Sequence, residues 1–339
     1  MQKEITTQQR LLNSNGCIES PGWSKAMLQE YRRQDIKAPR WRIKEWDYYT
    51  VSNGRNVVCL TIADLTYMGM VAVSFLDLDK PSAQSATALT LLPWGKIGLS
   101  EDSNTSDVHF KNHRFKMDFV KKGEKRYLSC RVKQFYDKKE FQCEIQLEQP
   151  PMDTIVIATP WKEKPHAFYY NQKINCMKAT GYAQLGSEIC TFDNAVDFGT
   201  LDWGRGVWTY DNTWYWGSGN AWIGGKPFGF NIGYGFGDTS AASENALFYD
   251  GVCHKLEQVY FNIPSDDFMK PWKFSSSDGR FEMDFVPLFD RIDDTNACII
   301  STLAHQVFGR YSGKVVLDDG TVLEIHDLIG FAEKVRNRY

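Results

Sequence analysis

Short runs of apolar residues, spaced with a period close to two, recur along the whole chain. The clearest are residues 57–63, 70–75 and 228–232, which are rich in β-branched or aromatic side chains. Runs of this length and composition predict β-strands. Helical spacing is scarce, and only residues 24–33, after the Pro21-Gly22 turn, favour a short helix. We therefore expect an almost entirely β protein.

Turn signals in the second half join these runs into hairpins. Asp-Gly pairs at 250–251, 278–279 and 319–320 each lie between two strand-like segments. An Asp-Gly pair supplies the positive φ angles that tight hairpin turns require. The second half is therefore expected to form an antiparallel meander.

A sparse internal repeat predicts two similar halves. The hexapeptide RFKMDF at 114–119 recurs as RFEMDF at 280–285, an interval close to half of the chain. We expect a first antiparallel β-domain at 1–160, with an N-terminal extension, and a second at 161–339 that carries the candidate site. Closing each sheet into a barrel would remove its exposed edges.

Composition and charge narrow the function. The chain has 339 residues, of which 42% are hydrophobic, and 39 Lys and Arg against 42 Asp and Glu give a net charge of -3. That charge offers no basic field for a nucleic acid. No apolar run is long enough to span a membrane, and the N-terminus lacks the apolar core of a secretory signal. Eight dispersed cysteines, Cys298 among them, fit reduced thiols in a cytoplasmic protein whose oligomeric state the sequence leaves open.

Two segments carry a family resemblance. LDWGRGVW at 201–208 and FYYNQKIN at 168–175 resemble a bacterial family known as a domain of unknown function. More distantly, the DWG segment at 202–204 is similar to tandem lipocalin-like proteins that include carotenoid hydratases and tocopherol cyclase. That resemblance implies two calycin-type antiparallel β-barrels, and a carboxylic acid that protonates an unsaturated or isoprenoid substrate.

Two carboxyl groups in the second half are the candidate catalytic residues. Asp202 is followed three positions later by Arg205, and a bidentate ion pair across a glycine-rich turn would keep the Asp202 carboxylate charged. Glu244 follows the small residues 240–243 and precedes an apolar strand, where burial would raise its pKa and make it a proton donor. Each residue also has a purely structural alternative. Asp202 and Arg205 could form an ion pair that only closes one end of a barrel, and Glu244 could be an exposed loop residue.

The candidate substrate-binding residues are polar or aromatic side chains around these carboxyl groups: Lys173, Asn175, Arg205, Trp214, Trp216, Asn231 and His305. Lys173 and Asn175 would share one face of a strand, while Gln172 takes the other face. Trp214 and Trp216 would also share a face and could stack on a ligand or simply fill a core.

Three functions are compatible with these residues. The first is a hydratase-like or cyclase-like enzyme that uses acid-base chemistry on a small hydrophobic ligand. The second is a glycosidase that uses the same carboxyl groups, which would have to flank one pocket. The third is a lipocalin-like binding protein without catalysis. The chain has no Walker loop, no complete dinucleotide fingerprint and no zinc-binding spacing, so we expect no nucleotide cofactor and no metal.

Overall fold

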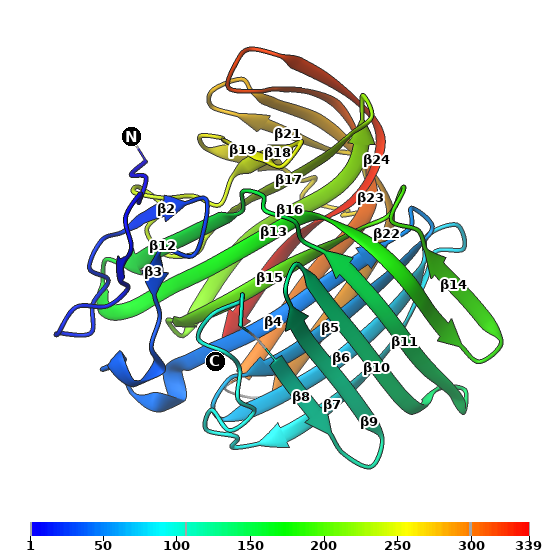
Figure 1. Ribbon diagram of the computed structural model, residues 1–339, viewed down its shortest axis with the longest axis horizontal. Helices are drawn as coiled ribbons and strands as arrows, with labels where there is room; N and C mark the ends of the chain where they lie inside the picture. The colour runs from blue at the N-terminus through cyan, green and yellow to red at the C-terminus, as the bar shows by residue number, and fades with distance from the viewer. Residues whose placement is uncertain (1, 106, 298–299, 339) are drawn as a thin grey trace.

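Two curled antiparallel sheets make up the protein in our computed structural model, which describes residues 2–105, 107–297 and 300–338 (Figure 1). The larger sheet contains β2 (Gly22–Ser24), β4 (Ile43–Ser52), β5 (Asn56–Asp64), β6 (Met68–Asp77), β7 (Ser82–Leu91), β8 (Asp107–Lys111), β9 (Phe115–Lys122), β10 (Lys125–Tyr136), β11 (Lys139–Glu148), β12 (Ile155–Trp161), β13 (Lys164–Leu185), β14 (Glu188–Phe192) and β15 (Phe198–Val207). The smaller sheet contains β16 (Asp211–Ile223), β17 (Lys226–Tyr234), β18 (Ala246–Tyr249), β19 (Val252–Lys255), β20 (Val259–Asn262), β21 (Trp272–Ser276), β22 (Phe281–Ala297), β23 (Ile300–Val316) and β24 (Val322–Arg338). The short strands β1 (Gln9–Arg10) and β3 (Gln29–Glu30) pair in parallel, and η1 (Arg33–Asp35) and η2 (Arg40–Arg42) are single 3₁₀ turns.

The predicted fold class is confirmed. The three apolar runs form β5, β6 and β17, and each Asp-Gly pair lies in a hairpin turn. Asp250 and Gly251, between β18 and β19, have φ angles of 51° and 81°. These positive φ angles are those that a tight hairpin turn requires.

The repeated hexapeptide forms equivalent strands in the two sheets. In β9 the buried side chains are Phe115, Met117 and Phe119, and in β22 they are Phe281, Met283 and Phe285. Both strands have antiparallel neighbours on each side. The repeat therefore marks a strand whose alternate side chains fill the core of its own sheet.

The predicted helix at 24–33 is wrong. Gln29 pairs with Gln9 in the small parallel sheet, and both Gln29 and Tyr31 are buried. Burial at positions two apart is the spacing of extended chain, not of a helix. Pairing with a distant strand therefore decides the local structure.

The chain passes from one sheet to the other between β15 and β16. The expected division at residue 160 falls within β12, and both β12 and the next strand, β13, belong to the larger sheet. The chain stays in the larger sheet after residue 160 because β13 is long. Its 22 residues pair with β12 and β15 in one half and with β11 and β14 in the other.

The cysteines that the structure describes are free, and Cys298 lies outside the described residues.

A third apolar core lies between the two sheets. It combines residues of the larger sheet, such as Tyr48 and Tyr169, with residues of the smaller sheet, such as Trp216 and Phe331. In this layer β4, β13 and β15 of the larger sheet meet β16 and β24 of the smaller sheet. The candidate site is built there.

Candidate functional site

All but the last residue of the LDWGRGVW segment lie in β15, and these residues alternate between two environments. Trp203 and Arg205 point into the core of the larger sheet, whereas Asp202 and Gly204 face the smaller sheet. A side chain at position 204 would overlap the indole ring of Trp46. The glycine therefore lets that ring lie against the strand.

Asp202 accepts two hydrogen bonds and forms one ion pair. Its Oδ1 atom lies 2.6 Å from Asn171 Nδ2 and 2.9 Å from Lys173 Nζ, and its Oδ2 atom lies 3.1 Å from Trp46 Nε1. Lys173 stands directly opposite Asp202 in the β13–β15 ladder. A carboxylate offers about four lone-pair positions. Asp202 can therefore accept one further hydrogen bond from a ligand.

Lys173 joins the two sheets at this point. Its side chain is buried, and Nζ lies 2.9 Å from Asp202 Oδ1 and 3.7 Å from Glu244 Oε2. The ammonium also lies 3.9 Å from the ring centre of Trp216, in a cation–π contact. Its charge therefore has partners on both sheets.

Glu244 is buried, as its proposed role required. It belongs to the loop between β17 and β18, and its carboxyl group occupies the space that a side chain at Gly233 would need. Burial, together with the nearby charge of Asp202, raises the pKa of Glu244 to about 7, although Lys173 acts in the opposite direction. Lys173 lines a cavity between the two sheets, which is described below, but Glu244 does not.

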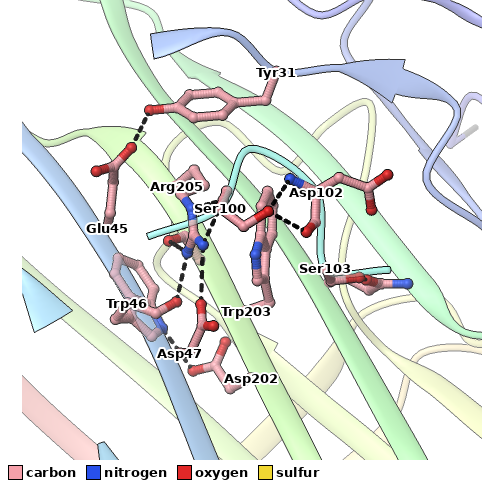
Figure 2. Close-up of polar contacts among 12 residues, drawn as sticks. Tyr31, Glu45, Trp46, Asp47, Ser100, Asp102, Ser103, Asp202, Trp203 and Arg205 are labelled. Carbon is pink, nitrogen blue, oxygen red and sulfur yellow. Dashed lines mark hydrogen bonds and ion pairs between the residues drawn. The ribbon is translucent and has the colours of Figure 1, made fainter. Parts of the chain in front are cut away.

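The predicted ion pair between Asp202 and Arg205 is wrong. Arg205 is buried on the other face of β15, where Nη2 lies 3.0 Å from Asp47 Oδ1 and 2.7 Å from the carbonyl oxygen of Ser100 (Figure 2). Residues three apart on a strand face opposite sides, and the segment is a strand rather than the expected turn. Arg205 therefore ties β4 and the loop at Ser100 into the core of the larger sheet.

A cavity of about 290 Å³ lies between the sheets, and Asp202 and Lys173 form part of its wall. We call it the inter-sheet cavity. Its aromatic lining consists of Trp46, Tyr48, Tyr169, Trp208, Trp214, Trp216 and Phe236. Cavities lined by aromatic side chains with a few placed polar groups are typical of small-molecule sites.

A second carboxyl group, Glu333 of β24, also lines the inter-sheet cavity. It accepts hydrogen bonds from Trp214 Nε1 and from Gln306 Nε2, both at 3.0 Å. Burial raises the pKa of Glu333 to about 7, against the effect of the Trp214 hydrogen bond and the charge of Lys173. Near neutral pH this side chain can therefore hold a proton that a ligand could receive.

Comparison with known proteins identifies the family. Residues 2–339 match the family described as "Domain of unknown function (DUF2804)". The chain belongs to this family. A search of curated protein sequences found no match.

Three solved structures are similar to this DUF2804 member. A Nitrosomonas europaea protein, NE1406, provisionally described as AttH, has 14% identity and a TM-score of 0.53, and the alignment covers 90% of this chain and 96% of that one. Kievitone hydratase from Nectria haematococca has 12% identity and a TM-score of 0.49, with 87% and 88% covered. CghA bound to Sch210972 has 9% identity and a TM-score of 0.44, with 86% and 88% covered. The similarity to NE1406 shows the fold.

The other predicted residues are divided between the cavity and the protein framework. Trp214 and Trp216 line the inter-sheet cavity, and Asn231 accepts a hydrogen bond from Trp216 Nε1 at 2.7 Å. Asn175 shares the face of Lys173, as expected, but it donates to Ser218 and to the carbonyl oxygen of Phe230. It holds the sheets together beside the cavity.

His305 lies away from the cavity. On β23 the residues on either side of it, Ala304 and Gln306, belong to the cavity lining, but His305 does not. Its Nδ1 atom lies 2.7 Å from Asp290 Oδ2, and its ring stacks on Phe268 with a centroid distance of 3.8 Å. The structure gives this histidine a packing role.

Sequence reasoning missed Glu333, Gln306 and the β4 side chains Trp46 and Tyr48. Glu333 shares a face of β24 with Phe331 and Val335, both buried, and a charged residue on such an apolar face is a usable signal. Within the described residues no three His, Cys, Asp or Glu side chains are placed to share a metal ion. In the same residues no helix has the length and apolar character needed to cross a membrane.

Proposed function

We propose that this protein performs acid-base chemistry on a small, mainly apolar compound bound in the inter-sheet cavity. The observation that carries this proposal is that two unlike carboxyl groups, one from each sheet, line the same cavity. Burial raises the pKa of Glu333 to about 7, whereas Asp202 accepts two hydrogen bonds and is paired with an ammonium. Carboxyl groups in such different environments are suited to separate acid and base roles.

The two groups would act together in the addition or removal of water. In hydration, Asp202 accepts a proton from water as the hydroxyl oxygen bonds to a carbon atom of the substrate double bond. Glu333 delivers its proton to the neighbouring carbon, and both carboxyl groups then exchange protons with solvent. Dehydration is the reverse, and in a cyclisation Glu333 alone would start the reaction by protonating the double bond.

Lys173 and Glu244 are positioning residues in this scheme. Lys173 holds Asp202 by the 2.9 Å ion pair, and Glu244 contacts the same ammonium from the other sheet. Because Glu244 does not line the cavity, it would influence the reaction through Lys173 rather than by touching the substrate. This revises the proton-donor role expected for Glu244 from the sequence.

The test is untargeted mass spectrometry of a deproteinised metabolite extract from the source organism. The wild-type protein should consume a compound and produce another that differs by one water, or an isomer if the reaction is a cyclisation. Asp202→Asn and Glu333→Gln should consume none, whereas Glu324→Gln, at an exposed position of β24, should match the wild type. Full consumption by both carboxyl variants would contradict the proposal.

A binding protein without catalysis is the second candidate, because all three donors around Asp202 already belong to the protein. It predicts a compound retained through native purification and no conversion by the wild type.

The glycosidase hypothesis has less support. Asp202 and Glu244 contact one ammonium between them, and Glu244 is absent from the cavity wall, so they do not flank a pocket as a sugar-cleaving pair would.

A further inference from the structure

Two residues that line the inter-sheet cavity each carry a buried hydrogen-bond donor with no acceptor in the described protein. The donors are the hydroxyl group of Tyr169 and the Nε1–H group of Trp208. The two residues are 0% and 3% exposed. A buried donor without an acceptor costs free energy, so such groups generally have a partner. Because both residues line the cavity, a ligand bound there is the candidate acceptor.

Packing of the rings keeps these donors where they are. The Tyr169 ring stacks between Phe236, at a centroid distance of 4.7 Å, and Trp46, at 6.0 Å. The Trp208 ring meets the Tyr169 ring edge-on at 5.5 Å. Because the rings are held on several sides, neither donor can easily turn toward a protein acceptor.

The Tyr169 hydroxyl group lies in the electric field of the candidate catalytic carboxyl groups. Burial, followed by the charges of Glu244, Asp202 and Glu333, raises the pKa of Tyr169 well above its ordinary value. The hydroxyl group therefore stays protonated and available as a donor at neutral pH. Its surroundings also place it beside the groups that would move protons.

We propose that the substrate carries a carbonyl oxygen that accepts hydrogen bonds from Tyr169 and Trp208, and that the double bond to be hydrated is conjugated to this carbonyl. The inference rests on the proposed function. A carbonyl oxygen can accept two hydrogen bonds and donates none, which matches two donors that lack acceptors. The flat aromatic walls fit a planar, conjugated compound.

The chemistry gives both donors a role in the reaction. When water adds to the carbon β to the carbonyl, its oxygen forms the new C–O bond and its proton goes to Asp202. The electron pair of the double bond moves onto the carbonyl oxygen, and the resulting enolate then takes the Glu333 proton at the α carbon. Donors aimed at an oxygen that gains negative charge stabilise the transition state.

The experiment compares three probes that differ at one group: 2-acetylnaphthalene, 1-(2-naphthyl)ethanol and 2-ethylnaphthalene. The wild-type protein should bind the ketone about tenfold more tightly than the ethyl compound, from two hydrogen bonds of ordinary net strength. Tyr169→Phe and Trp208→Phe should each reduce this ratio about threefold. The carbonyl stretch of the bound, ¹³C-labelled ketone should shift to lower frequency in the wild type and return toward its free value in Tyr169→Phe.

The neighbouring tyrosine provides a matched control. The Tyr170 hydroxyl group donates to the carbonyl oxygen of Gln29 at 2.6 Å, inside the core of the larger sheet. Tyr170→Phe should lower the melting temperature but leave the ketone preference unchanged. Tyr169→Phe should leave the melting temperature unchanged or raise it, because its hydroxyl group has no partner to lose.

Several results would overturn the inference. These are equal affinity of the wild type for the three probes, absence of binding by all three, alcohol binding as tight as ketone binding, or a ketone preference that survives in Tyr169→Phe and Trp208→Phe. Any of these, together with turnover in the metabolite extract, would refute the carbonyl assignment and leave the proposed function standing. A ketone preference without turnover would refute the proposed function alone.

Discussion

Replacing Glu244 by glutamine should change how the stability of the protein depends on pH. Glutamine has the shape of the protonated glutamic acid and does not ionise. The Glu244 side chain is 1% exposed, and neither of its carboxyl oxygens has a hydrogen-bond partner in the described residues. Glu244→Gln therefore alters the charge at this position and little else.

The size of the effect follows from the pKa change. Burial raises the pKa of Glu244 from 4.5 to about 7 in the folded protein. The folded state binds this proton more tightly than the unfolded state does. The proton on Glu244 therefore stabilises the wild type fully below about pH 4.5, and this contribution to the free energy of unfolding is lost as the pH rises to about 7. The loss amounts to about 3 kcal/mol, at roughly 1.4 kcal/mol per pKa unit. Above about pH 7 both states are ionised and the contribution stays constant.

Urea unfolding at a series of pH values measures this directly. The free energy of unfolding of Glu244→Gln, relative to the wild type, should rise by about 3 kcal/mol between about pH 4.5 and pH 7.5. Glu324→Gln is the control, because position 324 is exposed and its charge is solvated in both states. A Glu244→Gln curve that runs parallel to the wild type, as the control curve should, would refute the argument.

Three further predictions concern packing and position. Gly204→Ala places a methyl group against the Trp46 ring and should destabilise the protein by about 1–3 kcal/mol, and an unchanged melting temperature would be the contrary result. Arg205→Met removes the cation that lies 3.0 Å from the buried Asp47 carboxylate and should cost about 3–5 kcal/mol in urea unfolding, so a loss below about 1 kcal/mol would contradict this role. His305→Gln should leave turnover of the extract unchanged, since His305 is not in the cavity lining, and loss of turnover would place it in the site after all.

Local sequence signals were sufficient for the strands and the hairpins. Alternation at 228–232 and the Asp-Gly turns depend on neighbouring residues, and both were predicted correctly. The polar cluster of Lys173, Asp202 and Glu244 was also expected in one place. Pairing of β13 with β15 brings the first two together, and the loop after β17 adds Glu244.

Partners that depend on strand register could not be predicted. Asp202 and Arg205 are three positions apart, so whether they meet depends on whether the segment is a turn or a strand. Glu333 reaches the cavity because β24 pairs with β16, with Glu333 opposite Trp216. These two residues are more than a hundred positions apart, and no local pattern indicates that pairing.

The central claim is that Glu333 presents a neutral carboxyl group to the inter-sheet cavity near neutral pH. Infrared difference spectra of the wild type minus Glu333→Gln isolate this group from Glu244 and from the other carboxyl groups. We expect the band of a protonated carboxyl group at about pH 6, which disappears with a midpoint near pH 7. A difference spectrum that shows only an ionised carboxylate at about pH 6 would contradict the account, because Glu333 would then have no proton to deliver.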